Sequence, residues 1–153
     1  MSTEQNKAMV RRIYDELWNE RRLGVADEVI AEGAVNYDTG LAPMPFGPEE
    51  MKATVRMVTA AFPDNRHQVE EAIAEGDRVV LRCTLTGTHL GEFLGIPPTG
   101  RKIAVTEIHI YRMEDGKAVN TGSAGTTWAR CASSVRSPTP SPPRDRRLAT
   151  ESP

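Results

Sequence analysis

The spacing of hydrophobic residues changes once along this chain, near Pro63, and that change limits the fold more than any other feature. Helical spacing predicts helices over residues 3–22, 25–32 and 48–62, with Gly33 ending the second and Pro48 starting the third. After Pro63 the period is 2, which predicts strands over residues 67–74, 78–90, 102–113 and from 118 onward. A short strand is also predicted at residues 34–38. Helices first and strands second indicate an α+β fold, with three N-terminal helices packed on a curved antiparallel sheet.

Size and charge narrow the function classes. The 153 residues, 39% of them hydrophobic, suit one domain with a real core. The net charge of −2, with acids and bases interspersed, makes nucleic acid and membrane surfaces poor partners. No apolar run approaches the ~20 residues of a spanning helix, and the N-terminus lacks an apolar signal core. We therefore expect a cytoplasmic protein.

The C-terminal end differs in composition from the rest of the chain. From about Cys131, serine, proline, arginine and threonine dominate, with almost no apolar periodicity. We therefore predict a domain over residues 1–128 and a disordered tail over residues 129–153.

The strand at residues 102–113 carries the best candidates for chemistry. Alternation places Val105, Glu107, His109 and Tyr111 on one face, and Thr106, Ile108 and Ile110 on the other. On a concave face, His109 could move a proton and Glu107 could orient it. The alternative is a solvated face, on which Glu107 pairs with Arg82 or Arg101.

Several other residues are weaker candidates for a pocket. Asn36 and Tyr37 precede a Pro- and Gly-rich loop and could hydrogen-bond a ligand carbonyl, although a turn-initiating asparagine is the simpler interpretation. Trp18 and Tyr14 could wall a cavity or belong to the core, and Phe93, in the loop that we call the lip (residues 91–100), is a further candidate contact. His67 and His89 are predicted to be exposed, and Cys83 to pack as a small apolar residue. No metal, nucleotide or acyl-enzyme motif occurs, so we expect no metal and no cofactor.

Four segments together form a specific pattern: NKAMVRRIYDELWNE, GPEEMKATVRMVTAAFPD, AEGDRVVLRCTLTGTHLGEFLGIPPTGRKI and IHIYRMEDGK. In these segments the chain resembles the SnoaL-like polyketide cyclases, also called ester cyclases, of the nuclear-transport-factor-like fold. It implies a cone around an apolar cavity, a hydrophobic polyketide-like substrate, and ring closure by a cofactor-independent intramolecular aldol step. It also implies site roles for Asn36, His109 and Trp18, and a homodimer through the outer face of the sheet.

One part of the family pattern is missing. In the cyclases an aspartate on the final strand acts as acid and base, whereas this chain has Ser123 there and Thr126 at a second acidic position. Neither side chain is a base at neutral pH. We therefore include Ser123 only as a substrate contact.

A change of reading frame is our hypothesis for this loss. When the codons from Val119 are read one base earlier, with GC-rich third positions, they give Glu-His-Arg-x-Arg-Gly-Asn-Asp-Leu-Gly-Pro-Val-Arg-Gln-Leu-Gly, which looks like the family's usual C-terminus. A single-base deletion or a sequencing error near Val119 would explain the pattern, and ordinary divergence is the alternative. Resequencing the gene tests it, because clean reads without an extra base would remove the hypothesis.

Two main functions remain open from the sequence. The first is a cyclase-type enzyme, impaired by the missing aspartate, and the second is a non-catalytic small-molecule binder with the same fold. Another reaction of the fold, such as isomerisation or epoxide hydrolysis, is weaker because Glu107 and Asp38 are the only candidate pocket carboxylates.

Overall fold

The computed structural model describes residues 1–37, 42–123 and 127–136. Its helices are α1 (Thr3–Arg12), which continues as the π-helix η1 (Ile13–Asn19), α2 (Val25–Val29), α3 (Pro48–Ala61) and α4 (Thr127–Val135). Its strands are β1 (Ile30–Asn36), β2 (Met44–Pro45), β3 (Arg66–Glu75), β4 (Arg78–Thr88), β5 (Lys102–Glu114) and β6 (Lys117–Ser123). Within these residues, no helix combines the length and the apolar character that crossing a membrane requires.

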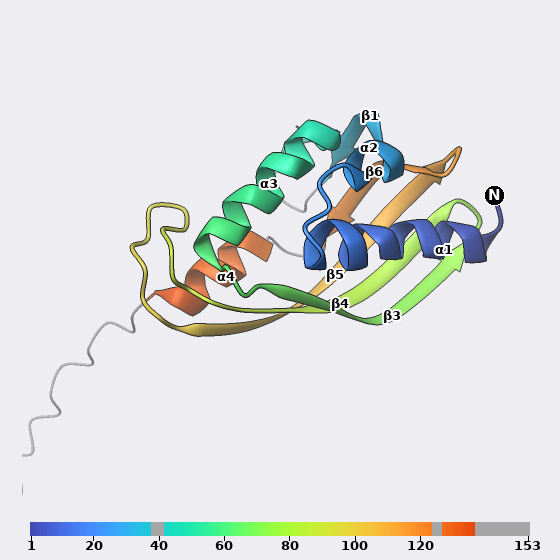
Figure 1. Cartoon of the computed structure of the whole chain (residues 1–153). Helices are drawn as coiled ribbons and strands as arrows, with labels where there is room; N and C mark the ends of the chain where they lie inside the picture. The colour runs from blue at the N-terminus through green and yellow to red at the C-terminus, as the bar shows by residue number, and fades with distance from the viewer. Residues whose placement is uncertain (38–41, 124–126, 137–153) are drawn as a thin grey trace, which may run out of the picture.

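The strands form one curved sheet in the order β2-β1-β6-β5-β4-β3, and the helices lie on one side of it (Figure 1). The predicted α+β architecture, with N-terminal helices on a curved sheet, is confirmed. The sheet is antiparallel except for one pair, because β1 runs parallel to β6. That exception follows from the chain path, since β1 enters the sheet after a helix and not through a hairpin with β6.

The core lies between the first helix and the sheet, and it fixes which strand faces point inward. Val10, Ile13 and Leu17 of α1 and η1 are fully buried, as is Leu81 of β4. On β5, burial alternates along the strand. Val105, Glu107 and Tyr111 are buried, whereas Ile108 and Ile110 on the opposite face are exposed. The predicted alternation of β5 is therefore confirmed, and its polar face points into the fold.

Two local predictions near the N-terminus are corrected. Helix α1 begins at the predicted Thr3, and the side chain of Ser2 caps it through a capping box with Gln5. Helix α2 ends at Val29, three residues earlier than predicted, because Ile30 is fully buried and pairs with Ala118 in the sheet. Gly33 consequently lies inside β1 and terminates no helix.

Two histidines predicted to be exposed are buried. His67 is 4% exposed and His89 is 0% exposed. The ring of His67 lies against Trp18, with 4.6 Å between ring centroids, and that of His89 lies 5.3 Å from Phe62. Trp18 of η1 covers His67, and Phe62, directly after α3, covers His89; a local period of 2 cannot reveal either contact.

The predicted start of the disordered tail, at residue 129, lies too early in the sequence. Helix α4 occupies part of the segment from residue 129, and Cys131, Ala132 and Val135 are buried. Arg130 also donates a hydrogen bond to the backbone oxygen of Thr106 on β5. A few apolar residues at helical spacing, among serines and arginines, are therefore enough for α4 to pack on the sheet. The prediction for residues 137–153 lies outside the described residues.

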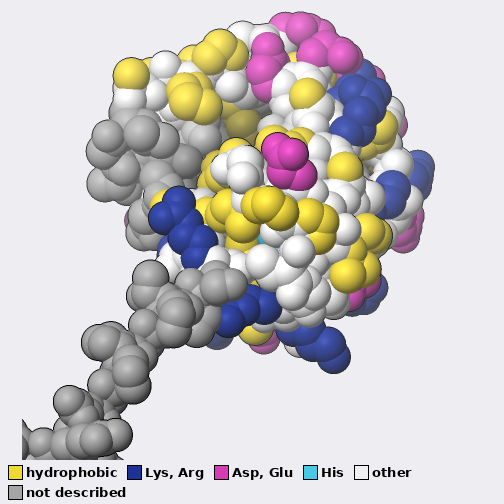
Figure 2. All heavy atoms as spheres, turned by 90° about the vertical axis from the view of Figure 1, so that its left-hand side faces the viewer, with side chains coloured by type: hydrophobic (Ala, Val, Ile, Leu, Met, Phe, Trp, Pro, Cys, Tyr) yellow, Lys and Arg dark blue, Asp and Glu magenta, His cyan; other side chains and the backbone are white. Residues whose placement is uncertain are grey.

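The lip (residues 91–100) begins where the chain meets the end of α3. The backbone N–H groups of Leu90 and Gly91 both donate to the carbonyl oxygen of Ala61. The lip forms one end of the molecule in Figure 1, and Figure 2 shows that end face-on, with hydrophobic side chains gathered over its middle. Leu90 and Leu94 are among the exposed hydrophobic residues of the chain.

We expect Gly91→Ala to destabilise the fold. A Cβ at this position would clash with the carbonyl oxygen of Ala60, so the lip or the end of α3 has to move. Overpacking of this kind costs about 1–3 kcal/mol of unfolding free energy. Denaturant unfolding measures it, with Gly33→Ala as the control because nothing lies within 4 Å of a Cβ there. Equal stability of the two variants would contradict the predicted clash.

Candidate active site

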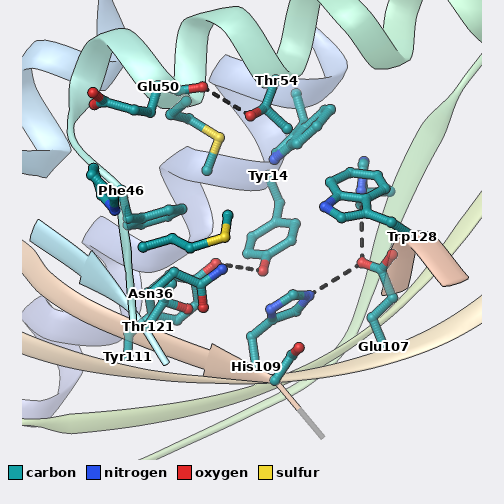
Figure 3. A pocket seen from close by; sticks show the side chains of 16 residues that line it. Tyr14, Asn36, Phe46, Glu50, Thr54, Glu107, His109, Tyr111, Thr121 and Trp128 are labelled. Atoms are coloured by element: carbon teal, nitrogen blue, oxygen red, sulfur yellow. Dashed lines mark hydrogen bonds and ion pairs between the residues drawn. The ribbon is translucent and has the colours of Figure 1, made fainter. Parts of the chain in front are cut away.

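A pocket opens between the helices and the concave face of the sheet (Figure 3). Its walls combine aromatic and apolar side chains with a group of polar ones on β1, β5 and β6. The lining residues are Tyr14, Trp18, Asn36, Met44, Pro45, Phe46, Glu50, Met51, Thr54, His67, Glu107, His109, Tyr111, Thr121, Ser123 and Trp128. Such a mixture suits a hydrophobic ligand that is oriented by a few polar contacts.

Glu107 and His109 form the polar centre of the pocket. They lie two residues apart on β5, so both point inward, and Nε2 of His109 is 3.3 Å from Oε2 of Glu107. Burial acts to raise the pKa of Glu107, but the hydrogen bond and the charge of His109 outweigh it and hold the pKa below its usual value. An ionised Glu107 accepts a hydrogen bond from Nε2–H, and in the ring tautomer that this bond selects, the free lone pair of His109 is on Nδ1.

His67 lies on the other side of Glu107. Its Nε2 is 3.8 Å from Oε2 of Glu107, and burial lowers its pKa to about 4, so the ring is neutral at neutral pH. Asn19 holds the backbone of His67 from both sides, donating to its carbonyl oxygen and accepting from its N–H at 2.8 Å each. Sequence reasoning missed His67. The sequence held a signal for it, because His67 opens a predicted strand and lies on the same face of that strand as the apolar Val69.

Two tyrosines supply neutral hydroxyl groups. The phenol oxygens of Tyr14 and Tyr111 lie 2.7 Å apart. Burial is the main cause that raises the pKa of both phenols above the ordinary value, so neither ionises at neutral pH. One of the two hydroxyls donates to the other, and the second proton of the pair can be donated elsewhere.

Asn36 and Ser123 complete the polar wall. Asn36 comes from β1, and its Oδ1 is buried without a hydrogen-bond partner among the described residues. Ser123 is the register partner of His109 in the β5–β6 pair and also lines the pocket. The structure thus brings positions 109 and 123 together across the neighbouring strands β5 and β6. It places no acid at position 123; Glu107 is the carboxylate that contacts His109, and Glu50 of α3 is a second carboxylate in the pocket lining.

Six of the eight predicted site residues line this pocket: Tyr14, Trp18, Asn36, Glu107, His109 and Ser123. Tyr37 and Phe93 do not. Tyr37 is 54% exposed because it follows the end of β1. Phe93 is buried in the core, with its ring 5.2 Å from Phe62 and 6.2 Å from Trp128.

The solvated alternative for the β5 face is wrong. Arg82 pairs with Glu71 on the outer face of the sheet, and Arg101 donates to the carbonyl oxygen of Arg136. Glu107 instead contacts His109, His67 and Cys83. Its 5% exposure confirms an interior position.

Comparison with known proteins points to one family. The model of the SnoaL-like polyketide cyclases matches residues 8–124. An aklanonic acid methyl ester cyclase, DnrD, of Streptomyces peucetius is 32% identical over 122 residues, which cover 76% of this chain and 80% of the relative. The nogalonic acid methyl ester cyclase of Streptomyces nogalater is 32% identical over 101 residues, which cover 65% of this chain and 75% of the relative.

Solved structures agree with that match. A SnoaL-like protein from Jannaschia sp. CCS1 superposes with a TM-score of 0.78 at 27% identity, covering 90% of this chain and 95% of the other. TsrD from Streptomyces laurentii has a TM-score of 0.75 at 21% identity, and the match covers 88% of this chain and 97% of TsrD. This likeness shows the shared fold alone.

Proposed function

Because the chain belongs to the SnoaL-like polyketide cyclase family, we propose that it closes a ring in the methyl ester of a polycyclic polyketide by an intramolecular aldol reaction. The observation that carries the proposal is the Glu107–His109 pair inside a pocket with apolar and aromatic walls. Relatives named for aklanonic and nogalonic acid methyl esters supply the substrate class.

His109 acts as the base in this proposal. Nδ1 takes a proton from the acidic carbon next to the ester carbonyl, and Glu107 stabilises the imidazolium through Nε2. The enolate carbon then attacks a ketone carbon of the same molecule, and the imidazolium returns its proton to the new alkoxide. One carbon–carbon bond forms and no atom is lost, so the product is an isomer of the substrate.

The neighbouring polar groups stabilise the enolate oxygen. The carboxamide of Asn36 and the Tyr14–Tyr111 hydroxyl pair lie on the wall beside His109 (Figure 3). Asn36 offers an N–H donor and the tyrosine pair one free O–H donor, both neutral, and a hydrogen bond from a positioned donor to a developing charge is strong. The proposed mechanism draws on this chain's own side chains and needs no cofactor.

We expect Asn36→Ala to lower kcat/KM about tenfold, which is the loss of one hydrogen bond of about 1.4 kcal/mol. Steady-state assays with aklanonic acid methyl ester measure it. Tyr37→Phe is the matched control, because the neighbouring Tyr37 lies outside the pocket lining and its substitution should leave kcat/KM unchanged. A larger effect at Tyr37 than at Asn36 would contradict the assigned positions.

A non-catalytic binder is the second candidate, and Ser123 in place of an acid favours it. The two functions give different results with the same ester. Quenching of tryptophan fluorescence reports binding through Trp18 and Trp128, which both line the pocket. Chromatographic detection of a product with unchanged mass reports ring closure. Quenching without product supports the binder, and quenching with product supports the enzyme.

A cytoplasmic location and a homodimer stay predictions. The exposed pair Ile108 and Ile110 on the outer face of β5 is available for a contact between copies. Size-exclusion chromatography with light scattering, comparing the wild type with Ile108→Lys, tests the dimer.

A further inference from the structure

Thr121 lies in the middle of a polar row that crosses three strands of the sheet. It pairs in register with Asn36 of β1 on one side and with Tyr111 of β5 on the other. Neighbouring strands are about 4.8 Å apart, and all three side chains line the pocket, so they lie side by side on its wall (Figure 3). Thr121 therefore stands between the two groups that the proposed mechanism uses to stabilise the enolate oxygen.

The position of the Thr121 side chain is closely fixed. The backbone N–H of Tyr37 donates to the carbonyl oxygen of Thr121 over 2.8 Å, which joins the ends of β1 and β6 at this point. The residue is only 5% exposed, and its branched Cβ restricts rotation about χ1. The Thr121 hydroxyl is thus confined to a few staggered positions beside its neighbours in the row.

Two atoms of the row lack a hydrogen-bond partner among the described residues. They are Oγ1 of Thr121, whose hydroxyl both donates and accepts, and Oδ1 of Asn36, which only accepts. Both atoms are buried, and a buried polar atom without a partner costs free energy. One hydrogen bond from the threonine hydroxyl to the amide oxygen satisfies both atoms.

Tyr111 is the competing acceptor for the Thr121 hydroxyl. Burial raises the pKa of the Tyr111 phenol, and a hydrogen-bonding effect of Thr121 is one of the smaller influences that oppose it. However, the phenol oxygen of Tyr111 already shares a hydrogen bond with that of Tyr14, at 2.7 Å. Oδ1 of Asn36 has no such partner among the described residues, so it gains more from the threonine proton.

We propose that Thr121 is a positioning residue whose hydroxyl donates to Oδ1 of Asn36 and so fixes which end of the carboxamide faces the ligand. With Oδ1 turned toward Thr121, the N–H group of Asn36 points into the pocket and donates to the enolate oxygen. Without this bond the carboxamide can turn over and present an acceptor, which repels the developing negative charge. The inference rests on the proposed function, because the enolate is what makes the choice of end matter.

Denaturant unfolding of four proteins tests the hydrogen bond without any substrate. They are the wild type, Thr121→Val, Asn36→Leu and the double variant, since valine and leucine keep similar shapes and remove the polar groups. The two effects on the unfolding equilibrium constant should be non-additive by at least about threefold, as for residues in contact. The matched cycle of Thr121→Val with Tyr111→Phe should be additive within about twofold.

Steady-state assays with aklanonic acid methyl ester test the role in catalysis. Thr121→Val should lower kcat about 3–10-fold with little change in KM, because at most the hydrogen bond from Asn36 is lost. Thr121→Ser keeps the hydroxyl and should restore kcat to within about twofold of the wild type. In an Asn36→Ala background, Thr121→Val should have no further effect, since the group that it positions is absent.

Three results would overturn the inference: an additive cycle for Thr121 and Asn36, coupling with Tyr111 alone, or an equal loss of kcat in Thr121→Val and Thr121→Ser. If Thr121→Val does not fold, Thr121→Ala removes the same hydroxyl and takes its place in the cycle. A coupled cycle in a protein without turnover supports the hydrogen bond and contradicts only the proposed reaction. The two failures are therefore seen separately.

Discussion

Replacing His109 by glutamine is expected to lower kcat/KM for ring closure by about 10²–10⁴-fold, the usual contribution of a positioned general base. Glutamine keeps a polar group near Oε2 of Glu107, 3.3 Å from Nε2 in the wild type, but cannot take a proton at neutral pH. The loss should fall mainly on kcat, because His109 forms only part of a lining of sixteen residues.

The control for His109→Gln is substrate binding. Quenching of tryptophan fluorescence by the ester should change by no more than about threefold, since most of the pocket is intact. A variant with kcat/KM within about twofold of the wild type would exclude His109 as the base. A variant that binds no ester would show instead that His109 serves binding.

Ser123→Asp is expected to raise kcat/KM by about 10²-fold, the lower end of the range for a general acid or base. Position 123 is the register partner of His109, so the new carboxylate enters the pocket beside the proposed base. Burial and the nearby negative charge of Glu107 would raise the pKa of the new side chain, which brings it toward the range that proton transfer at neutral pH needs.

Ser123→Asn is the matched control, because asparagine has the shape of aspartate without an ionisable group. It should leave kcat/KM within about twofold of the wild type. Equal rates for the two variants would show that the carboxylate at this position does no chemistry. Steady-state assays of both proteins on one ester preparation make the comparison.

Much of the fold follows from the sequence because local pattern and burial agree there. The period of 2 on β5 placed Glu107, His109 and Tyr111 on one face, and the structure has them inside. Helix α3 begins at the predicted Pro48 and ends at Ala61, one residue before the prediction. In these segments each residue's environment is set by its own strand or helix.

The differences come from contacts between distant segments. Burial of His67 depends on Trp18, on the first helix, and α4 is ordered by packing on β5. Cys83 and Glu107 meet only through the register of two strands, so their contact could not be predicted from the sequence. Tyr37 and Phe93 lie next to predicted pocket segments in the sequence, and such a neighbourhood does not fix where a side chain points.

The absence of an acid on the final strand departs from the family pattern, and its cause is a question for the gene sequence. The family match continues to residue 124, beyond Val119, and β6 pairs with β5 as far as Ser123. The change of reading frame near Val119 stays a hypothesis that DNA sequencing tests.

Incubation of the purified wild-type protein with aklanonic acid methyl ester tests the central claim most directly. We predict a product of unchanged mass and different chromatographic retention, formed faster than in buffer and at a rate proportional to protein concentration. Tryptophan quenching by the ester, with isomer formation no faster than in buffer, would contradict the claim and leave the chain a binding protein of this family.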